Sequence, residues 1–232
     1  MRSPESGIVA RSLELHTRQG RVFGPVSFEA HPGTIAAVLG ASGNGKTALL
    51  LSLAGRMRTS RGSISVCGLD TKRDAAKVRA AVGLGLIAGV NDLEPGLTAA
   101  QHVAEQRLIV GRARRTSQDV LAAVGLSAAA SLRARDLAAE QRIRLGIALA
   151  LVGRPRVLVV DDLDRDLTGE QVASVALTLR SLANGGVTVL VACLDPTSAA
   201  FADTTVWATA QLAELEDEKA DSESEEVARA FA

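Results

Sequence analysis

Apolar residues along the chain form short, strand-like runs separated by longer segments with helical spacing. Residues 8–16 and 22–30 alternate apolar and polar side chains around a glycine-containing turn, which predicts two paired strands. Residues 34–40, 156–160 and 187–194 are nearly continuous apolar runs, typical of strands that are buried on both faces.

The remaining periodic segments complete an alternation of strands and helices. A short strand between glycines is predicted at 62–68, and a further strand is possible at 84–89. Helical spacing is found at 47–57, at 169–184 and over much of 97–152. This order predicts an α/β fold with a largely parallel sheet.

Composition and charge favour a globular chain. Its 232 residues are 47% hydrophobic, enough for one sizeable core, and 26 basic residues balance 26 acidic ones. Eight acids and one lysine fall within 214–226, so we expect a solvated, disordered tail and a mildly basic body. This basicity is too mild to indicate nucleic acid, and Arg112, Arg114 and Arg115 are interpreted as a solvated helix end.

The cysteines, histidines and apolar runs indicate a cytoplasmic setting. Cys67 and Cys193 lie in apolar, strand-like runs and are interpreted as reduced core thiols, while the three histidines lack zinc-ligand spacing. No apolar run approaches the roughly 18 residues of a membrane span, and the first residues lack the apolar core of a signal peptide. Membrane association is therefore expected only through a partner.

Residues 40–47, GASGNGKT, match the pattern G-x-x-x-x-G-K-[ST], with a predicted strand before them and a predicted helix after them. Glycines allow successive N–H groups to surround a phosphate, and the helix start favours an anion. We expect Lys46 to reach the β- and γ-phosphates and Thr47 to offer its hydroxyl to Mg²⁺. A glycine-rich turn without a ligand is the alternative, which both flanking elements disfavour. The expected binding residues are Gly40, Ala41, Ser42, Gly43, Asn44, Gly45, Lys46 and Thr47.

A second candidate lies where the apolar run 156–160 ends in Asp161 and Asp162. A carboxylate at the carboxyl end of a buried strand can hold Mg²⁺ through water. Such an ending is weak evidence alone, but it follows a complete phosphate-loop pattern. The sequence therefore predicts an Mg-ATP site formed by the loop and Asp161.

Six blocks in order make residues 7–212 resemble a nucleotide-binding subunit of an ATP-binding cassette (ABC) transporter. They are VSFEAHPGTIAAVLG, GASGNGKT, RGSISVCGLD, LEPGLTAAQHV, AEQRIRLGIALALVGRPRVLVVDD and TVLVACLD. The resemblance implies a P-loop NTPase of ABC type, with a mixed, largely parallel core sheet, an N-terminal antiparallel β subdomain and a helical subdomain. It implies one domain over 1–212, with the helical subdomain at about 96–150 and the acidic tail at 213–232.

The resemblance also implies partners. In this family two cassettes close head to tail on membrane subunits, and ATP lies between the phosphate loop of one cassette and the signature, L-S-G-G-Q, of the other. This chain instead has Leu137-Ala138-Ala139-Glu140-Gln141 at the signature. The change removes a hydroxyl, adds a methyl group and places a carboxylate near a phosphate position, unless that carboxylate turns to solvent.

Other family positions differ too. Asp162 replaces the glutamate that positions water, and a misplaced base can reduce the rate by about a hundredfold. Gly89 replaces the sensing glutamine, Leu194 the histidine and Thr168 an aspartate. A shift of alignment does not restore the glutamine, since Gln101 lies twelve positions too late, or the histidine, since 187–201 contains none. The adenine-stacking aromatic is also missing near residues 16–18, where His16 or Arg18 could stack instead.

These departures lead to a main hypothesis and two alternatives. The main one is an ATP-binding subunit of an ABC transporter complex with impaired hydrolysis, in which Asp162 is a weak candidate base. Integral-membrane subunits and a second cassette would be its partners, on the cytoplasmic face of the membrane. The first alternative is a regulatory or scaffold protein that uses ATP occupancy as a signal. The second is an active, divergent ATPase in which Asp162 suffices.

Overall fold

The computed structural model describes residues 7–111 and 116–208. Its first sheet is antiparallel and four-stranded, and the predicted pair at its N-terminus is confirmed. The strand order is β2-β1-β4-β5, with β1 at Ile8–Thr17, β2 at Gly20–Ala30, β4 at Arg61–Val66 and β5 at Leu69–Asp70. The predictions for the arginine cluster at 112–115 and for the acidic tail lie outside the described residues.

The second sheet contains five strands, and each pair of neighbours is parallel. The order is β6-β7-β8-β3-β9, formed by Val82–Leu84, Val157–Val160, Thr188–Cys193, Ile35–Leu39 and Thr204–Trp207. The predicted largely parallel core sheet is confirmed, and the antiparallel pairs among the strands β1 to β9 all lie in the first sheet.

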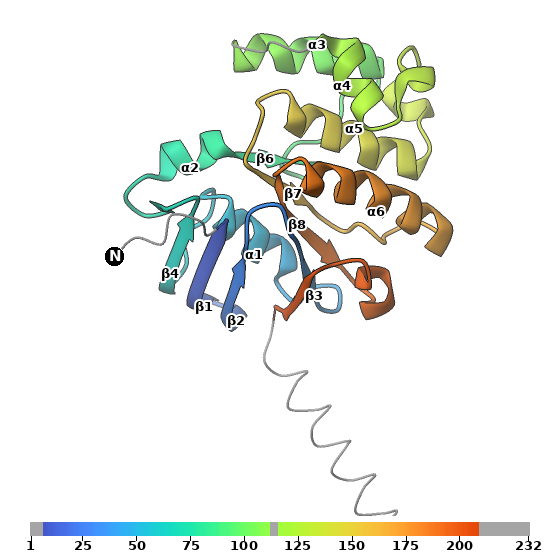
Figure 1. The fold of residues 1–232 in the computed structure, drawn as a ribbon. Coiled ribbons are helices and arrows are strands. Elements are labelled where there is room, and N and C mark those ends of the chain that lie inside the picture. Colours follow the sequence, from blue (N-terminus) through green and yellow to red (C-terminus); the bar gives the residue numbers. More distant parts are fainter. Residues whose placement is uncertain (1–6, 112–115, 209–232) are drawn as a thin grey trace, which may run out of the picture.

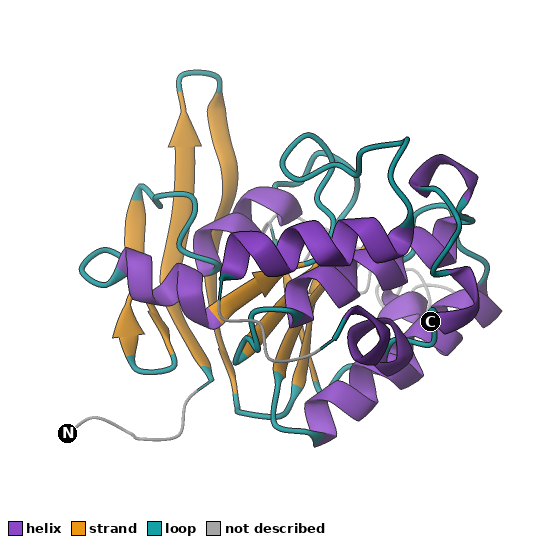
Figure 2. Ribbon diagram, turned by 90° about the horizontal axis from the view of Figure 1, so that it is seen from above, coloured by secondary structure: helices purple, strands orange, loops and turns teal. Residues whose placement is uncertain are grey.

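Helices lie on both faces of the parallel sheet. Figure 1 shows α1 near the antiparallel strands, α5 and α6 on the other side, and α3 and α4 beyond α5. The helix bounds are Lys46–Leu53 for α1, Ala75–Ala81 for α2, Ala99–Val110 for α3, Ser117–Ala123 for α4, Ala139–Leu151 for α5 and Gly169–Asn184 for α6. Figure 2 shows the antiparallel strands gathered at one side of the molecule.

Alternate side chains of the central strands enter two different cores. Ala36 and Val38 pack with α1 and the antiparallel sheet, whereas Ile35, Ala37 and Leu39 pack with the cluster that includes α5 and α6. All five residues of β3 are buried, as the continuous apolar run predicts. The phosphate loop therefore follows a strand that is fixed from both faces.

Two local predictions require correction. The possible strand at 84–89 is mostly a loop, because β6 ends at Leu84. In that loop the Asn91 side chain accepts from Ile87 N at 2.8 Å and donates to Gly85 O at 2.8 Å. Cys67 lies in the turn after β4 and is only partly buried, so it is not a core strand residue.

Among the described helices, none is long and apolar enough to cross a bilayer.

Candidate functional site

The loop between β3 and α1 has the backbone form that phosphate binding requires. Helix α1 begins at Lys46, and Gly45 precedes it in the left-handed region with φ 76°. A Cβ atom on Gly45 would collide with the carbonyl oxygen of Val22 in β2. Glycine is thus required here both by the backbone angle and by close packing against the antiparallel sheet.

Lys46 is almost buried, with 5% of its surface exposed. Its Nζ donates to Gly40 O at 2.7 Å and to Ala41 O at 3.0 Å, so the ammonium lies against its own loop. An ammonium has three donors, which leaves one beyond these two bonds. On the same loop, a Cβ at Gly43 would meet no atom within 4 Å, so that side of the loop is open. This arrangement fits an anion held by the loop and by Lys46.

Thr47 and Asp161, the two residues predicted to hold Mg²⁺, are in direct contact. Thr47 Oγ1 donates to Asp161 Oδ2 at 2.7 Å, although 114 positions separate the two residues. Burial raises the pKa of Asp161, and the Thr47 hydrogen bond opposes that rise. A hydroxyl and a carboxylate are hard oxygen donors that suit Mg²⁺. The residues present therefore fit Mg²⁺ beside a bound phosphate chain.

Asp162, the candidate base, adjoins Asp161 but is already engaged. Its N–H donates to Asp161 Oδ1 at 3.1 Å, and its own Oδ2 lies 2.7 Å from Nη2 of Arg165. Its backbone has a positive φ of 45°, which is unusual for a residue with a side chain. Sequence reasoning missed this ion pair, although an acid three residues before an arginine was a visible signal.

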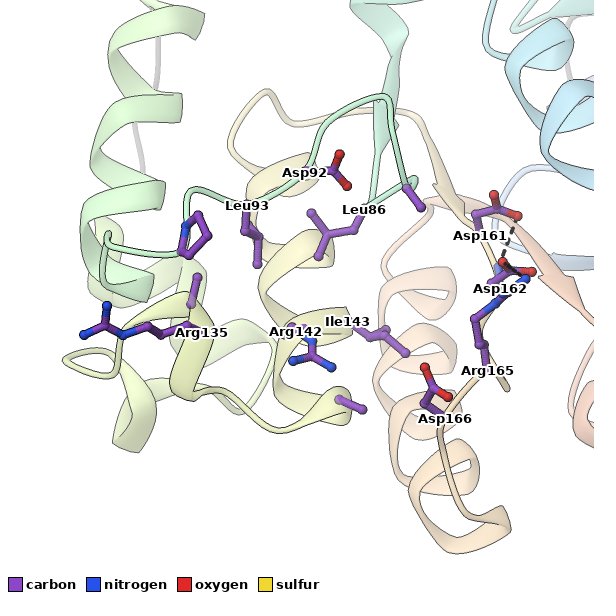
Figure 3. A pocket seen from close by; sticks show the side chains of 14 residues that line it. Leu86, Asp92, Leu93, Arg135, Arg142, Ile143, Asp161, Asp162, Arg165 and Asp166 are labelled. Carbon is purple, nitrogen blue, oxygen red and sulfur yellow. Dashed lines mark hydrogen bonds and ion pairs between the residues drawn. The ribbon is translucent and has the colours of Figure 1, made fainter.

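Asp162 lines a cavity of about 550 Å³ between the acidic strand end and the start of α5. In Figure 3 the acidic strand end and the following turn form one side, and the helical segments form the other. No residue of the loop 40–47 lines this cavity. Asp161 connects the two regions, because it accepts from Thr47 and also lines the cavity.

The segment Leu137–Gln141, at the signature position, leads into α5, which begins at Ala139. Ala138 occupies the N-cap without a side-chain oxygen, so only the reciprocal bond forms, from Ala138 N to Gln141 Oε1 at 2.9 Å. Glu140 turns along the helix, where its Oε1 accepts from Arg144 Nε at 2.9 Å. The sequence left open whether the Glu140 carboxylate faces a phosphate or solvent. In the structure it pairs with Arg144 within α5 instead.

The positions expected for the glutamine and the histidine hold no polar side chain. Gly89 has φ 73°, and its N–H donates to Asp92 carboxylate oxygens at 3.0 and 3.1 Å. Leu194 follows β8, and its N–H donates to Asp164 at 2.9 Å. Only backbone groups of these two residues therefore make polar contacts.

The two other predicted positions have local structural roles. Thr168 caps α6, where its Oγ1 accepts from Gln171 N at 3.3 Å and its N–H donates to Gln171 Oε1 at 2.9 Å. His16 lies in β1, with Nε2 3.0 Å from Glu14 Oε2. Stacking of adenine on His16 or Arg18 stays a prediction.

The parallel sheet, the glycine-rich loop at the end of β3 and the buried Lys46 define a P-loop nucleotide-binding domain. Residues 23–164 match the family model described as ABC transporter, so the chain belongs to the ABC transporter family. Within that family it is an ATP-binding subunit, and the predicted family and fold class are confirmed.

Similar proteins include both export and import components. A cytochrome c biogenesis ATP-binding export protein, CcmA, from Nitrobacter winogradskyi is 36% identical over 73% of this chain and 84% of its own length. The methionine import ATP-binding protein MetN 1 from Rhodococcus jostii is 35% identical over 75% of this chain and 54% of its own. The solved structure of cbiO1 from Clostridium perfringens, part of the ABC transporter complex cbiONQ, superposes with a TM-score of 0.74 at 20% identity. That superposition covers 88% of this chain and 85% of cbiO1.

Proposed function

We propose that this subunit binds Mg-ATP through residues 40–47 and Asp161, and that its own ATP hydrolysis is weak. The observation that carries the binding proposal is the convergence of Lys46, Thr47 and Asp161 at the end of β3. Lys46 lies against the loop carbonyls at 2.7 and 3.0 Å, and Thr47 bonds Asp161 at 2.7 Å. When bound, Mg²⁺ would supply charge neutralisation to the phosphates.

We infer weak hydrolysis from Asp162 and Leu194, which stand where the family has its water-positioning glutamate and its histidine. Asp162 is one methylene shorter than glutamate, and its carboxylate is paired with Arg165 at 2.7 Å. Leu194 has no side-chain donor for a phosphate oxygen. Binding uses contacts already present in the ground state, whereas turnover requires groups that stabilise the transition state. The loop can therefore retain ATP binding while the rate of hydrolysis is low.

We also propose that the chain works in a complex with integral-membrane subunits and a second cassette, on the cytoplasmic face of the membrane. ABC ATP-binding subunits dimerise and act with membrane components. A homodimer would repeat the Leu137–Gln141 and Leu194 departures at both sites, so a second, different cassette is the favoured partner. Residues 1–212 would form the cassette, with its helical subdomain at about 96–150, and 213–232 an acidic tail.

Titration of the full chain with labelled ATP tests this function. Saturable binding that requires magnesium is expected, and Lys46→Ala is expected to weaken it by at least about tenfold, because the ammonium contact is lost. Arg61→Ala, at the exposed start of β4, is a matched control that should bind as the wild type does. Absence of saturable binding by folded protein, or unchanged binding by Lys46→Ala, would contradict the proposal.

A further inference from the structure

The Asp162–Arg165 pair forms within a single turn. Arg165 N donates to Asp162 O at 3.1 Å, and Arg165 Nη2 lies 2.7 Å from Asp162 Oδ2. The backbone hydrogen bond already holds residues 162 and 165 close together. Formation of the ion pair therefore fixes only the two side chains and no further backbone. A short turn of this kind makes the ion pair a local property of residues 162–165.

The turn is also anchored to the end of β8. Leu163 is fully buried, and its N–H donates to Ala192 O at 2.9 Å. The Asp164 carboxylate accepts from the N–H groups of Leu194 and Asp195, each at 2.9 Å. These bonds hold the backbone on both sides of Asp162 and Arg165. The two side chains therefore stay within reach of each other while the loop remains folded.

Arg165 is the cation that contacts the Asp162 carboxylate. Asp161 and Asp166 add negative charge nearby, and Arg135 and Arg142 line the same cavity. Among the described residues, the ion pair of Asp162 is with Arg165. A carboxylate positions water by accepting a hydrogen bond at about 3 Å. The guanidinium occupies Oδ2 and turns the carboxylate toward residue 165.

We infer that Arg165 is a positioning residue that restrains Asp162, so that the pair must open before Asp162 can orient water for ATP hydrolysis. This inference rests on the proposed function. The side chains are 51% and 26% exposed for Arg165 and Asp162, so solvent weakens the pair. An exposed ion pair of this kind lowers the fraction of molecules in which Asp162 and Arg165 are apart by about two- to fivefold. Arg165 thus limits turnover without abolishing it.

The test is ATP turnover by the full chain at saturating Mg-ATP. Arg165→Gln is expected to raise the rate by about two- to fivefold, which general structural damage would not do. Arg165→Lys, which retains a cation, should stay near the wild-type rate. Arg135→Gln removes an equal charge from the same cavity and should leave the rate unchanged. Asp162→Asn combined with Arg165→Gln should abolish the increase.

A second measurement uses the nucleotide-free chain. Thermal unfolding of Asp162→Asn, Arg165→Gln and the double variant should show coupling, because each single change breaks the same pair. Additive effects would overturn the inference. Three results of the turnover assay would also overturn it. They are a rate for Arg165→Gln at or below that of the wild type, undetectable turnover by both proteins, and a raised rate in the Asp162→Asn/Arg165→Gln double variant. If the wild type binds Mg-ATP in each such case, the proposed binding function stands; loss of binding overturns both.

Discussion

Lys46 and Asp161 are charged side chains that the described fold buries, and both belong to the candidate site. Burying a charged group is costly unless hydrogen bonds replace its contacts with water. Two loop carbonyls accept from Lys46, and Thr47 and the Asp162 N–H donate to Asp161. At the scale of single residues, buried charge is thus concentrated where the family binds nucleotide.

The two thiols provide a residue-scale prediction about reactivity. Burial, with a smaller contribution from Asp164, raises the pKa of Cys193 to about 12. Burial also raises the pKa of Cys67, opposed by Arg156, but Cys67 is partly exposed. Since the thiolate is the nucleophile, the raised pKa and the complete burial of Cys193 both make this thiol unreactive in the folded chain. Timed alkylation followed by mass spectrometry should modify Cys67 first, and Cys193 only after unfolding. Equal rates in the folded chain would contradict this.

At the scale of elements, Arg144 joins α5 to α6 and to the end of α4. Its guanidinium donates to Glu140, to Val124 O at 2.7 Å, to Thr178 Oγ1 at 2.9 Å and to Ser174 Oγ at 2.8 Å. Only 11% of the Arg144 side chain is exposed, so these acceptors lie largely away from water. One polar side chain therefore adds hydrogen bonds to the apolar packing that holds the helix with the altered signature against its neighbours.

Replacing this residue by Arg144→Met should lower the free energy of unfolding by about 2–4 kcal/mol, because several partly buried polar groups lose their partner. Chemical denaturation measures the change. Arg142→Met is the matched control: Arg142 is exposed and its guanidinium donates to Leu137 O at 3.3 Å, so a change within about 0.5 kcal/mol is expected. Similar losses for both variants would show that the Arg144 contacts contribute little.

Helix α5 also approaches the loop after β6 closely. A Cβ on Gly146 would lie 2.6 Å from Leu86 N and Cγ, so the loop would have to move. Alanine gains about 1 kcal/mol in helix propensity, while overpacking costs about 1–3 kcal/mol. We expect Gly146→Ala to destabilise the chain by about 1 kcal/mol in urea unfolding. Gly153→Ala, which would meet no atom within 4 Å, should be neutral. A stabilised Gly146→Ala chain would contradict the close approach.

For the whole molecule, the sequence predicted the elements with strong periodicity and the residues of the phosphate loop. Helix α6 spans the predicted 169–184. Helix α2 was missed because Val78 is its single buried residue, and β9 because it has no fully buried residue and depends on pairing with the distant β3. The Asp162–Arg165 pair depends on a positive φ and on anchoring by β8, neither of which apolar spacing records.

The distribution of charge gives the last prediction. Residues 213–232 contain eight acids and two bases in a chain with a net charge of zero, so their removal leaves a remainder with net charge +6. At about 0.15 M salt the Debye length is about 8 Å, so charge far from the site has little effect there. Deletion of 213–232 should raise the isoelectric point above 6.8 and leave Mg-ATP affinity within about twofold. Isoelectric focusing and ATP titration measure the two effects. Lys46→Ala in the shortened chain should still lose binding, whereas a large affinity change on deletion alone would place the tail close to the nucleotide.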